Sequence, residues 1–252
     1  GKTIICASNR NIKKILKRIK NKNLLTYGDE KGVDYRISNL RFKVDYSIFD
    51  LNYRDNNNIK KKINNICVKL LGKHNIFNAT AAVIVCINLG VPQNVIKRSL
   101  KRFTGVQRRM TKLFSRNSND FYDDYAHHPT EIKSILSSVK NIYNNRKIIA
   151  VFEPHRYSRI TSLKKEFSKS FSKADLVIMC PVYAAGEKKN YNFNLISFGK
   201  LISKESKTHV IIVKNRSELS NFLRKNLIKD ELIIGMGAGI ISKWMAELKL
   251  DL

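Results

Sequence analysis

Short apolar runs alternate with amphipathic stretches along most of the chain. Runs of four to six apolar residues, such as TIICA near the start and IIAVF in the middle, predict β-strands. Between such runs, apolar residues recur every three or four positions, as in NIKKILKRI, which predicts a helix with one apolar face. The alternation predicts an α/β fold with a mostly parallel sheet.

The alternation is irregular at first and regular later. Residues 34–71 hold short β-like stretches around a polar loop, RDNNNIKKK, and a buried helix follows in HNIFNATAAVIVCINLG. After GVQRRM, strands are predicted in DFYDDYA, KIIAVFEP, DLVIMCPVY, HVIIV and ELIIGMG, with helices between them and IISKWMAELKL last. The stretch SRITSLKKEFSKSFSKA is predicted as one helix. We therefore predict two domains, residues 1–108 and 109–252, with the boundary near Val106–Arg109.

Composition indicates a globular cytoplasmic protein. The 252 residues are 43% apolar, and no run approaches the ~18 apolar residues of a membrane-spanning helix. The first residues lack the apolar stretch of a secretory signal. The four cysteines have no C-x-x-C spacing, so we expect reduced thiols and no metal site; they are Cys6, Cys67, Cys86 and Cys180.

The net charge of +28 is spread along the whole chain rather than gathered in one segment. Lysine is accompanied everywhere by asparagine and isoleucine, which is typical of a compositional bias more than of a binding patch. Such a charge could also serve nucleic-acid binding. No aromatic-rich RNA-binding motif and no zinc-finger spacing accompanies it, so no specific nucleic acid is expected.

The first three residues match the end of a Walker A phosphate loop. In such a loop, however, Gly-Lys-Thr lies between a strand and a helix, whereas Gly1-Lys2-Thr3 runs directly into the strand-like IIC. We interpret the match as chance. Because the chain has no initiator methionine and begins next to a strand, we expect it to be the later part of a longer protein.

The stretch with the highest density of ionisable side chains is YDDYAHHPTE, residues 122–131, which lies between a predicted strand and a predicted helix. The carboxyl ends of parallel strands are where α/β sheets bind ligands. A helix start accounts for Pro129 and Glu131. It does not account for the remaining set, which is Asp123, Asp124, Tyr125 and His127.

Three other stretches offer weaker signals. In FEPHRYSR, Arg156 and Arg159 share one face if the helix has begun, and would clamp a carboxylate or phosphate; two solvated arginines are the alternative. Asn75 and Asn78 start a helix, where Asn75 alone could be an N-cap. Arg109 falls at the predicted junction, and GMGAG is predicted to be a packing turn.

Together these stretches resemble the Mur ligase family. YRISNLRF, GKHNIFNATAA, GVQRRM, DDYAHHPTEI, FEPHRYSR, DLVIMCPVYAAGE and GMGAG occur in the family's order and cover nearly the whole chain. DDYAHHPTE would also fit the murein peptide ligases, whereas PHRYSR with PVYAAGE favours the alanine-adding branch. Ile240 departs from the polar residue usual after GAG.

The resemblance implies a fold of three domains: a UDP-binding, a central ATPase and a C-terminal Rossmann-like domain. Residues 1–108 would be the later part of the central domain, which is of the P-loop type, and residues 109–252 the whole C-terminal domain. The family's phosphate loop, its lysine, and the Glu and His that serve Mg²⁺ would precede residue 1.

The resemblance also implies an activity. L-alanine would be ligated to the lactyl carboxylate of UDP-N-acetylmuramate through an acyl phosphate, with ATP and Mg²⁺, during peptidoglycan precursor synthesis in the cytoplasm. Three alternatives stay open: a murein peptide ligase of the same family, a non-catalytic remnant, and a basic nucleic-acid-binding protein.

The resemblance further implies residue roles. Asn75 and Asn78 would contact the nucleotide, Arg109 its phosphates and Asp124 its ribose. The face that holds the amino acid and the muramate carboxylate would comprise Tyr125, His127, His155, Arg156 and Arg159. Arg109, Asp124 and His127 are the expected catalytic residues. The choices between Asp123 and Asp124, and between His127 and His128, stay open.

Overall fold

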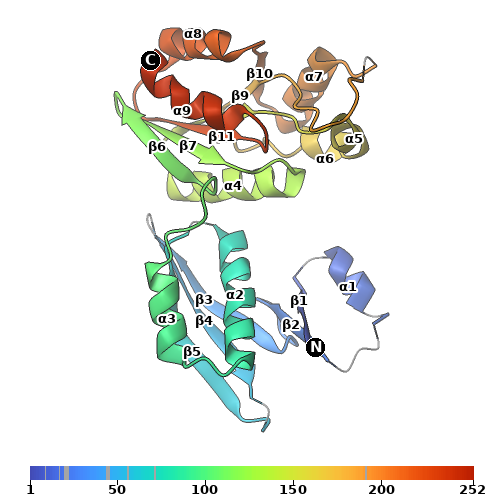
Figure 1. The fold of residues 1–252 in the computed structure, drawn as a ribbon, viewed down its shortest axis with the longest axis vertical. Helices are drawn as coiled ribbons and strands as arrows, with labels where there is room; N and C mark the ends of the chain where they lie inside the picture. Colours follow the sequence, from blue (N-terminus) through green and yellow to red (C-terminus); the bar gives the residue numbers. More distant parts are fainter. Residues whose placement is uncertain are drawn as a thin grey trace. The chain divides into compact units, whose positions relative to one another are not determined.

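The computed structural model describes residues 1–8, 10–16, 18–19, 23–43, 46–55, 57–70, 72–190 and 192–252, with only the backbone for residues 10 and 11. The chain forms two compact units, residues 1–105 and residues 106–252 (Figure 1). Within the described residues, none of the helices is both long and apolar enough to cross a bilayer.

The first unit is built on a mixed five-stranded sheet in the order β1-β2-β3-β4-β5. The strands are β1 (Thr3–Cys6), β2 (Leu24–Gly28), β3 (Tyr35–Phe42), β4 (Ser47–Arg54) and β5 (Lys60–Val68). The pairs β1–β2 and β2–β3 are parallel, and β3–β4 and β4–β5 are antiparallel. The helices are α1 (Arg10–Leu16), α2 (Lys73–Asn88) and α3 (Gln93–Arg102).

One face of this sheet is covered by α2 and α3. In-register apolar residues of β3, β4 and β5, namely Ile37, Leu51 and Ile63, are buried there. Strand β5 begins inside the predicted polar loop RDNNNIKKK, because Lys60–Lys62 pair in register with residues 52–54 of β4. Main-chain pairing does not depend on the side chain, so three lysines can continue a hairpin that their propensity disfavours.

The second unit is built on a six-stranded sheet in the order β10-β9-β8-β11-β7-β6. The strands are β6 (Thr111–Arg116), β7 (Asn119–Asp124), β8 (Lys147–Phe152), β9 (Leu176–Met179), β10 (His209–Ile212) and β11 (Glu231–Met236). All neighbours are parallel except β6 and β7. The helices are α4 (Pro129–Ile142), α5 (Tyr157–Ser162), α6 (Lys164–Ser168), α7 (Leu195–Ser206), α8 (Arg216–Asn226) and α9 (Ile241–Asp251).

Helices cover both faces of this sheet, so it has two hydrophobic cores. Figure 1 shows α4 on one face and α8 and α9 on the other. The α4 side buries apolar residues of α4, α6 and α7, among them Leu136, Phe167 and Phe198. The opposite side buries residues of α8 and α9, among them Leu223 and Met245. The predicted α/β fold with a mostly parallel sheet is confirmed for this unit.

Two local predictions for the second unit were wrong. Strand β6 was not predicted, because TKLFSR lacks an apolar run; it is an edge strand whose Phe114 stacks on Phe121 of β7 at a centroid distance of 4.3 Å. The single helix predicted from Ser158 is two helices, α5 and α6, separated at Leu163. Leu163 has φ −112° and ψ 23°, outside the regular helical range.

Candidate functional site

The carboxyl ends of three parallel strands bring the main sequence motifs of the second unit together. Met236 at the end of β11 is in register with Asp124 of β7 and with Phe152 of β8. Beyond the strands, the Gly237 N–H donates to the Asp124 carbonyl at 3.2 Å, and the Glu153 N–H donates to the Met236 carbonyl at 2.9 Å. Residues 122–131, 152–159 and 235–239 therefore share one edge of the sheet, where parallel sheets bind ligands.

Both candidate aspartates are buried, and each has a different partner. Asp124 accepts hydrogen bonds from the N–H groups of Ala126 at 2.7 Å and Met110 at 2.8 Å. Burial raises its pKa to about 6, against the opposing effect of these bonds. Asp123 accepts from Ser242 Oγ at 2.5 Å and lies 3.4 Å from Arg108 Nε. Asp123 thus connects β7 to α9 through a hydrogen bond, and Asp124 connects β7 to the segment before β6 in the same way.

Two arginines lie against the ring of Tyr125. The guanidinium carbons of Arg108 and Arg109 are 4.9 and 5.7 Å from the ring centroid. Arg108 also donates from Nη2 to the Gly237 carbonyl at 2.7 Å, and Arg109 Nη1 lies 3.6 Å from Glu131 Oε1. Tyr125 is 37% exposed, so its ring holds both cations at the surface of the sheet edge.

The structure separates the roles of the two neighbouring histidines. His128 is the N-cap of α4, and its Nδ1 accepts from the Thr130 N–H at 3.3 Å. His127 instead has its Nδ1 2.8 Å from the Tyr125 carbonyl, and its ring centroid lies 5.2 Å from that of His155. His127 therefore belongs to the cluster at the strand ends, and His128 belongs to the helix.

His155 lies in the loop after β8 with its ring between other side chains. The ring stacks on Tyr183 at a centroid distance of 5.6 Å and an interplanar angle of 26°. Arg159 Nη1 is 3.0 Å from its Nδ1. Burial, together with the charges of His127, Arg159 and Arg156, lowers the pKa of His155 to about 4.

The arginine pair differs from its predicted geometry. Helix α5 begins at Tyr157, so Arg156 precedes it and does not share a helical face with Arg159. Arg156 has φ 66°, in the left-handed region that side chains rarely adopt. At the start of α5, the Glu187 carboxylate accepts from the Ser158 N–H at 3.1 Å and from Ser158 Oγ.

Glu153 is a site-forming residue that sequence reasoning missed. Its carboxylate is buried and accepts from three consecutive N–H groups at the start of α9, those of Gly239 (2.9 Å), Ile240 (3.0 Å) and Ile241 (3.4 Å). Burial raises the pKa of Glu153 against these bonds. The amide of the last residue of GMGAG and the amides of the next two residues thus bind the Glu153 carboxylate in the loop after β8, which supports the packing-turn interpretation. An acidic residue directly after the apolar run IIAVF was the available signal.

The remaining predicted residues lie in the first unit, on α2. Asn75 is buried, and its N–H donates to the Gly72 carbonyl at 3.1 Å. Asn78, one turn later, is exposed. Gly72 precedes the helix at φ 95°, a conformation that favours glycine. The two asparagines therefore differ in solvent access although their spacing places them on one face.

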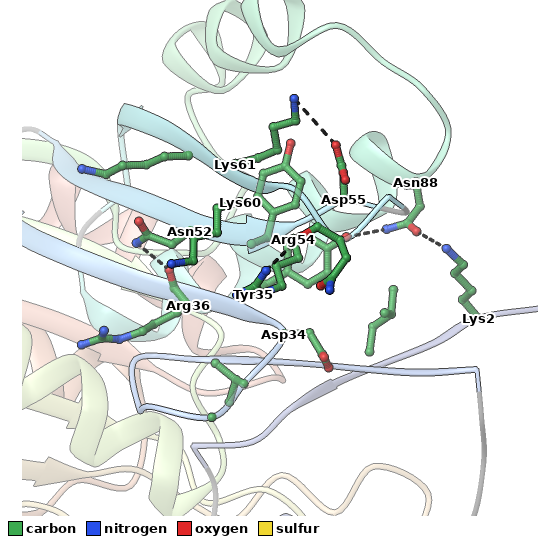
Figure 2. A pocket seen from close by; sticks show the side chains of 16 residues that line it. Lys2, Asp34, Tyr35, Arg36, Asn52, Arg54, Asp55, Lys60, Lys61 and Asn88 are labelled. Carbon is green, nitrogen blue, oxygen red and sulfur yellow. Dashed lines mark hydrogen bonds and ion pairs between the residues drawn. The ribbon is translucent and has the colours of Figure 1, made fainter.

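The first unit also contains a cavity of about 770 Å³ beside β3, β4 and β5 (Figure 2). Six basic and two acidic side chains line it, but several of these charges have partners within the unit. Figure 2 shows Lys61 directed toward Asp55 (3.7 Å) and Lys2 bonded to Asn88 (2.7 Å). Neither Asn75 nor Asn78 lines the cavity, so it is separate from the predicted site residues.

The described part of the chain offers little for a metal ion. Among those residues, no group of three or more His, Cys, Asp or Glu side chains could hold one. Asp123, Asp124 and Glu153 are already bonded to Ser242 or to main-chain amides. These residues do not fit a Mg²⁺ site.

Comparison with known proteins places both units in one family. Residues 108–239 match the Mur ligase glutamate ligase domain, and residues 1–86 match the Mur ligase middle domain. The chain is 44% identical over 248 residues to a UDP-N-acetylmuramate–L-alanine ligase of Pelagibacter ubique, covering 98% of this chain and 53% of the relative. A ligase of the same name from Hydrogenobaculum is 35% identical, with 98% and 52% covered. The chain therefore spans about half the length of the curated relatives it matches.

Solved structures show the same fold. A UDP-N-acetylmuramate–alanine ligase from Thermotoga maritima superposes with a TM-score of 0.73 at 23% identity, covering 99% of this chain and 51% of the other. A murein peptide ligase from Psychrobacter arcticus gives a TM-score of 0.71 at 19% identity, with 100% and 51% covered.

Proposed function

The chain belongs to the Mur ligase family, and from this we propose that it acts in the ATP-dependent ligation of L-alanine to the lactyl carboxylate of UDP-N-acetylmuramate. The substrates are those in the names of its relatives. The observation that carries the proposal is the cluster of Tyr125, His127, His155 and Arg159 at the carboxyl ends of β7 and β8. The setting would be peptidoglycan precursor synthesis in the cytoplasm.

The chemistry explains why such a site needs cations and imidazoles. A carboxylate is a poor electrophile, so ATP would first convert it to an acyl phosphate. The alanine amine would then attack the acyl carbon, and the tetrahedral intermediate would lose phosphate. Mg²⁺, when bound, would offset charge on the phosphates. Anionic charge persists through every step, so positioned cations would carry much of the catalysis.

Different residues of this chain would bind the carboxylate, the phosphates and the nucleoside. Arg156 and Arg159 would bind a substrate carboxylate, because guanidinium groups donate several directed hydrogen bonds to carboxylates. Arg109, held against Tyr125, would face the phosphates. Asn78, the exposed residue of its pair, and Asp124 would contact the nucleoside. The two matched family domains support residues 1–108 as central and 109–252 as C-terminal domain.

The test is phosphate release from ATP, with both substrates present, by this chain joined to the part of its Pelagibacter ubique relative that it does not cover, because the chain spans 53% of that relative. Release should require L-alanine and UDP-N-acetylmuramate together, and should fail with UDP-N-acetylglucosamine, which lacks the lactyl carboxylate. Arg159→Met should raise the KM for a carboxylate substrate or abolish turnover, whereas Lys164→Met, which removes an exposed charge nearby, should not. Release by the joined protein that needs neither substrate, or no release from it at all, contradicts the proposal, whereas this chain alone is expected to release none. Turnover with a free tripeptide that begins with L-alanine, in place of L-alanine itself, would favour a murein peptide ligase.

A further inference from the structure

Acidic residues are absent from a long middle part of the chain. Residues 56–119 contain thirteen lysines and arginines and no aspartate or glutamate, although the whole chain has 20 acidic residues. A basic side chain of this part is therefore offset only where the fold brings a carboxylate from elsewhere. Lys61 and Lys62 are offset in this way, by Asp55 at 3.7 Å and by Asp50 at 3.0 Å. Most of the other basic residues of the first unit line one groove.

This groove, the α3–β5 groove, has a volume of about 1050 Å³ and lies where α3 passes the edge strand β5. Figure 1 shows α3 beside β5. Ile48 of β4 and Cys67 of β5 pair in register and form part of its wall. They alternate along their strands with the buried Phe49 and Val68, so they face away from the core. The other described lining residues are Tyr46, Asn65, Lys69, Lys97, Arg98, Lys101 and Arg102.

The charge of the α3–β5 groove is of one sign. Five of its described lining residues are basic and none is acidic. None of the five is in an ion pair or a side-chain hydrogen bond with another described residue. Arg41 brings a further cation to the wall, because its Nη2 donates to Asn65 Oδ1 at 2.6 Å. The groove therefore attracts an anion that carries several charges.

The basic residues of α3 form two adjacent rows on the helix. Lys97 lies four residues before Lys101, and Arg98 lies four residues before Arg102, so like charges are neighbours and repel one another. The helix dipole favours the two cations of the last turn. It does not account for Lys97, nor for Lys69, which follows β5. A bound polyanion would offset the repulsion among all of them.

The shape and lining of the groove favour a nucleic-acid strand over a membrane surface. The apolar residues of α3, Ile96 and Leu100, pack into the core of the first unit, so this helix has no apolar face to insert into lipid. Tyr46 is 36% exposed and offers an aromatic ring to a base. Proteins bind single strands with such a combination, a cationic groove that follows the phosphates and an aromatic side chain on which a base stacks.

We propose that the α3–β5 groove binds single-stranded nucleic acid without sequence preference, with its five cations on phosphates and Tyr46 stacked on a base. The sequence predicts no specific nucleic acid, and binding to phosphates and to one ring face agrees with that. Neither Asn75 nor Asn78 lines the groove, so the proposal goes beyond the proposed ligase function and does not rest on it.

The first experiment measures how salt weakens binding. The probe is a fluorescein-labelled oligouridylate of ~12 nucleotides, titrated with the chain and followed by fluorescence anisotropy. Five phosphate contacts predict a slope of ~−3.5 for log K against log salt, so a rise from ~50 to ~200 mM should weaken binding ~100-fold. Lys97→Gln/Lys101→Gln should reduce the slope to ~−2.1.

The matched control is Lys200→Gln/Lys204→Gln. It removes two exposed lysines at the same spacing on α7, in the second unit, and should leave the slope unchanged. Equal slopes for the two double variants, or no binding of the oligouridylate by the wild type, overturn the proposal.

The second experiment locates the bound strand through Cys67. This thiol lines the groove, whereas Cys6 and Cys86, which are also half-buried, do not. Saturating oligouridylate should slow the modification of Cys67 by N-ethylmaleimide, measured by peptide mass spectrometry, and leave the rates of Cys6 and Cys86 unchanged. An unchanged rate at Cys67 means that the strand binds elsewhere on the basic surface, which overturns the proposal.

The third experiment separates a nucleic acid from other polyanions. Tyr46→Leu removes the aromatic ring and should weaken oligouridylate binding by ~5-fold or more. The same variant should bind inorganic polyphosphate as the wild type does, because polyphosphate has no bases. An equal effect on both ligands, or none on either, shows a site for phosphate chains alone and overturns the proposal. Binding to phosphatidylglycerol vesicles that oligouridylate does not displace assigns the groove to a membrane and overturns it as well.

Discussion

Arg146 joins three strands at the amino ends of the second sheet, and replacing it should destabilise that unit. Its guanidinium donates to Asp120 Oδ2 at 2.6 Å and to three carbonyl oxygens, those of Asp230 (3.0 Å), Ser118 (2.9 Å) and Glu231 (2.9 Å). These partners belong to the β6–β7 hairpin and to the start of β11, while Arg146 directly precedes β8. Arg146→Met keeps much of the aliphatic stem and removes every one of these bonds.

The expected loss follows from those four contacts. A hydrogen bond to a charged group contributes ~1.5–3 kcal/mol when fully buried. The Arg146 side chain is 19% exposed, and water can reach the released carbonyls, so we take ~0.5–1 kcal/mol for each of the three. The ion pair with Asp120 adds ~1 kcal/mol after solvent screening, because Lys112 still pairs with that carboxylate at 2.7 Å. The sum is about 3 kcal/mol.

The assay uses the one tryptophan of the chain. Trp244 lies in α9 and packs against the core of the second unit, so its fluorescence reports that unit during urea unfolding. The matched control is Arg116→Met, an exposed arginine of the same hairpin for which the described residues show no side-chain partner; it should change the free energy of unfolding by less than ~0.5 kcal/mol. A loss below ~1 kcal/mol, or one equal to that of the control, would refute the reasoning.

The ion pair also makes a pH-dependent contribution. Burial acts to raise the pKa of Asp120, but hydrogen bonds from Lys112, Ser115 and Arg146 lower it from 3.8 to about 2. A carboxylate with a lowered folded-state pKa stabilises the fold above ~4, and the contribution is lost as pH falls through ~2. The full shift corresponds to ~2.4 kcal/mol, which we reduce to ~1 kcal/mol for solvent screening. Asp120→Asn should remove this dependence between pH 4 and 2.

Three further predictions concern the core, the buried acid and the asparagine pair. Phe152→Ala should cost ~3–5 kcal/mol in the same fluorescence assay, because the ring is fully buried; a cost below ~1.5 kcal/mol contradicts the packing. Burial raises the pKa of Asp124 from 3.8 to about 6, so its contribution is full below pH ~4 and is lost as pH rises through ~6. Between pH 4 and 7, the free energy of unfolding of the wild type should therefore fall by ~3 kcal/mol relative to that of Asp124→Asn. Parallel profiles of unfolding free energy against pH for the two proteins would exclude this effect of Asp124. Asn75→Ala should destabilise the first unit by ~1–2 kcal/mol in circular dichroism melts, because Asn75 is buried. Asn78→Ala should leave the melt unchanged and weaken nucleotide binding, because Asn78 is exposed. Equal melting temperatures for the two variants count against this difference between a structural and a binding asparagine.

Sequence periodicity predicted most of the second sheet, and the reason is local. Buried parallel strands are continuous apolar runs, and KIIAVF and ELIIGM became β8 and β11. Because parallel strands end at a common edge, the motifs after β7 and β8 could be expected to meet before any contact was known. The two asparagines of α2 were likewise placed on one helix by spacing alone.

Tertiary contacts decided the chemistry of the site. The sequence left His127 and His128 equivalent; one became a helix cap and the other a partner of His155. Glu153 appeared only as a residue after a strand, yet it holds three amides at the start of α9, 86 to 88 residues away. The helix predicted from Ser158 begins one residue earlier, at Tyr157, and Arg156 lies just outside it.

The division follows from the range of the forces involved. Strand and helix periodicity depends on neighbours within a few residues, so the sequence by itself determined the α/β pattern, the strands that would share an edge and the residue types gathered there. Protonation, tautomer and hydrogen-bond partner depend on atoms within about 3 Å whatever their distance along the chain. Only the folded unit brings Arg159 to His155 and the Tyr125 carbonyl to His127, and so gives two identical side chains different hydrogen-bond partners.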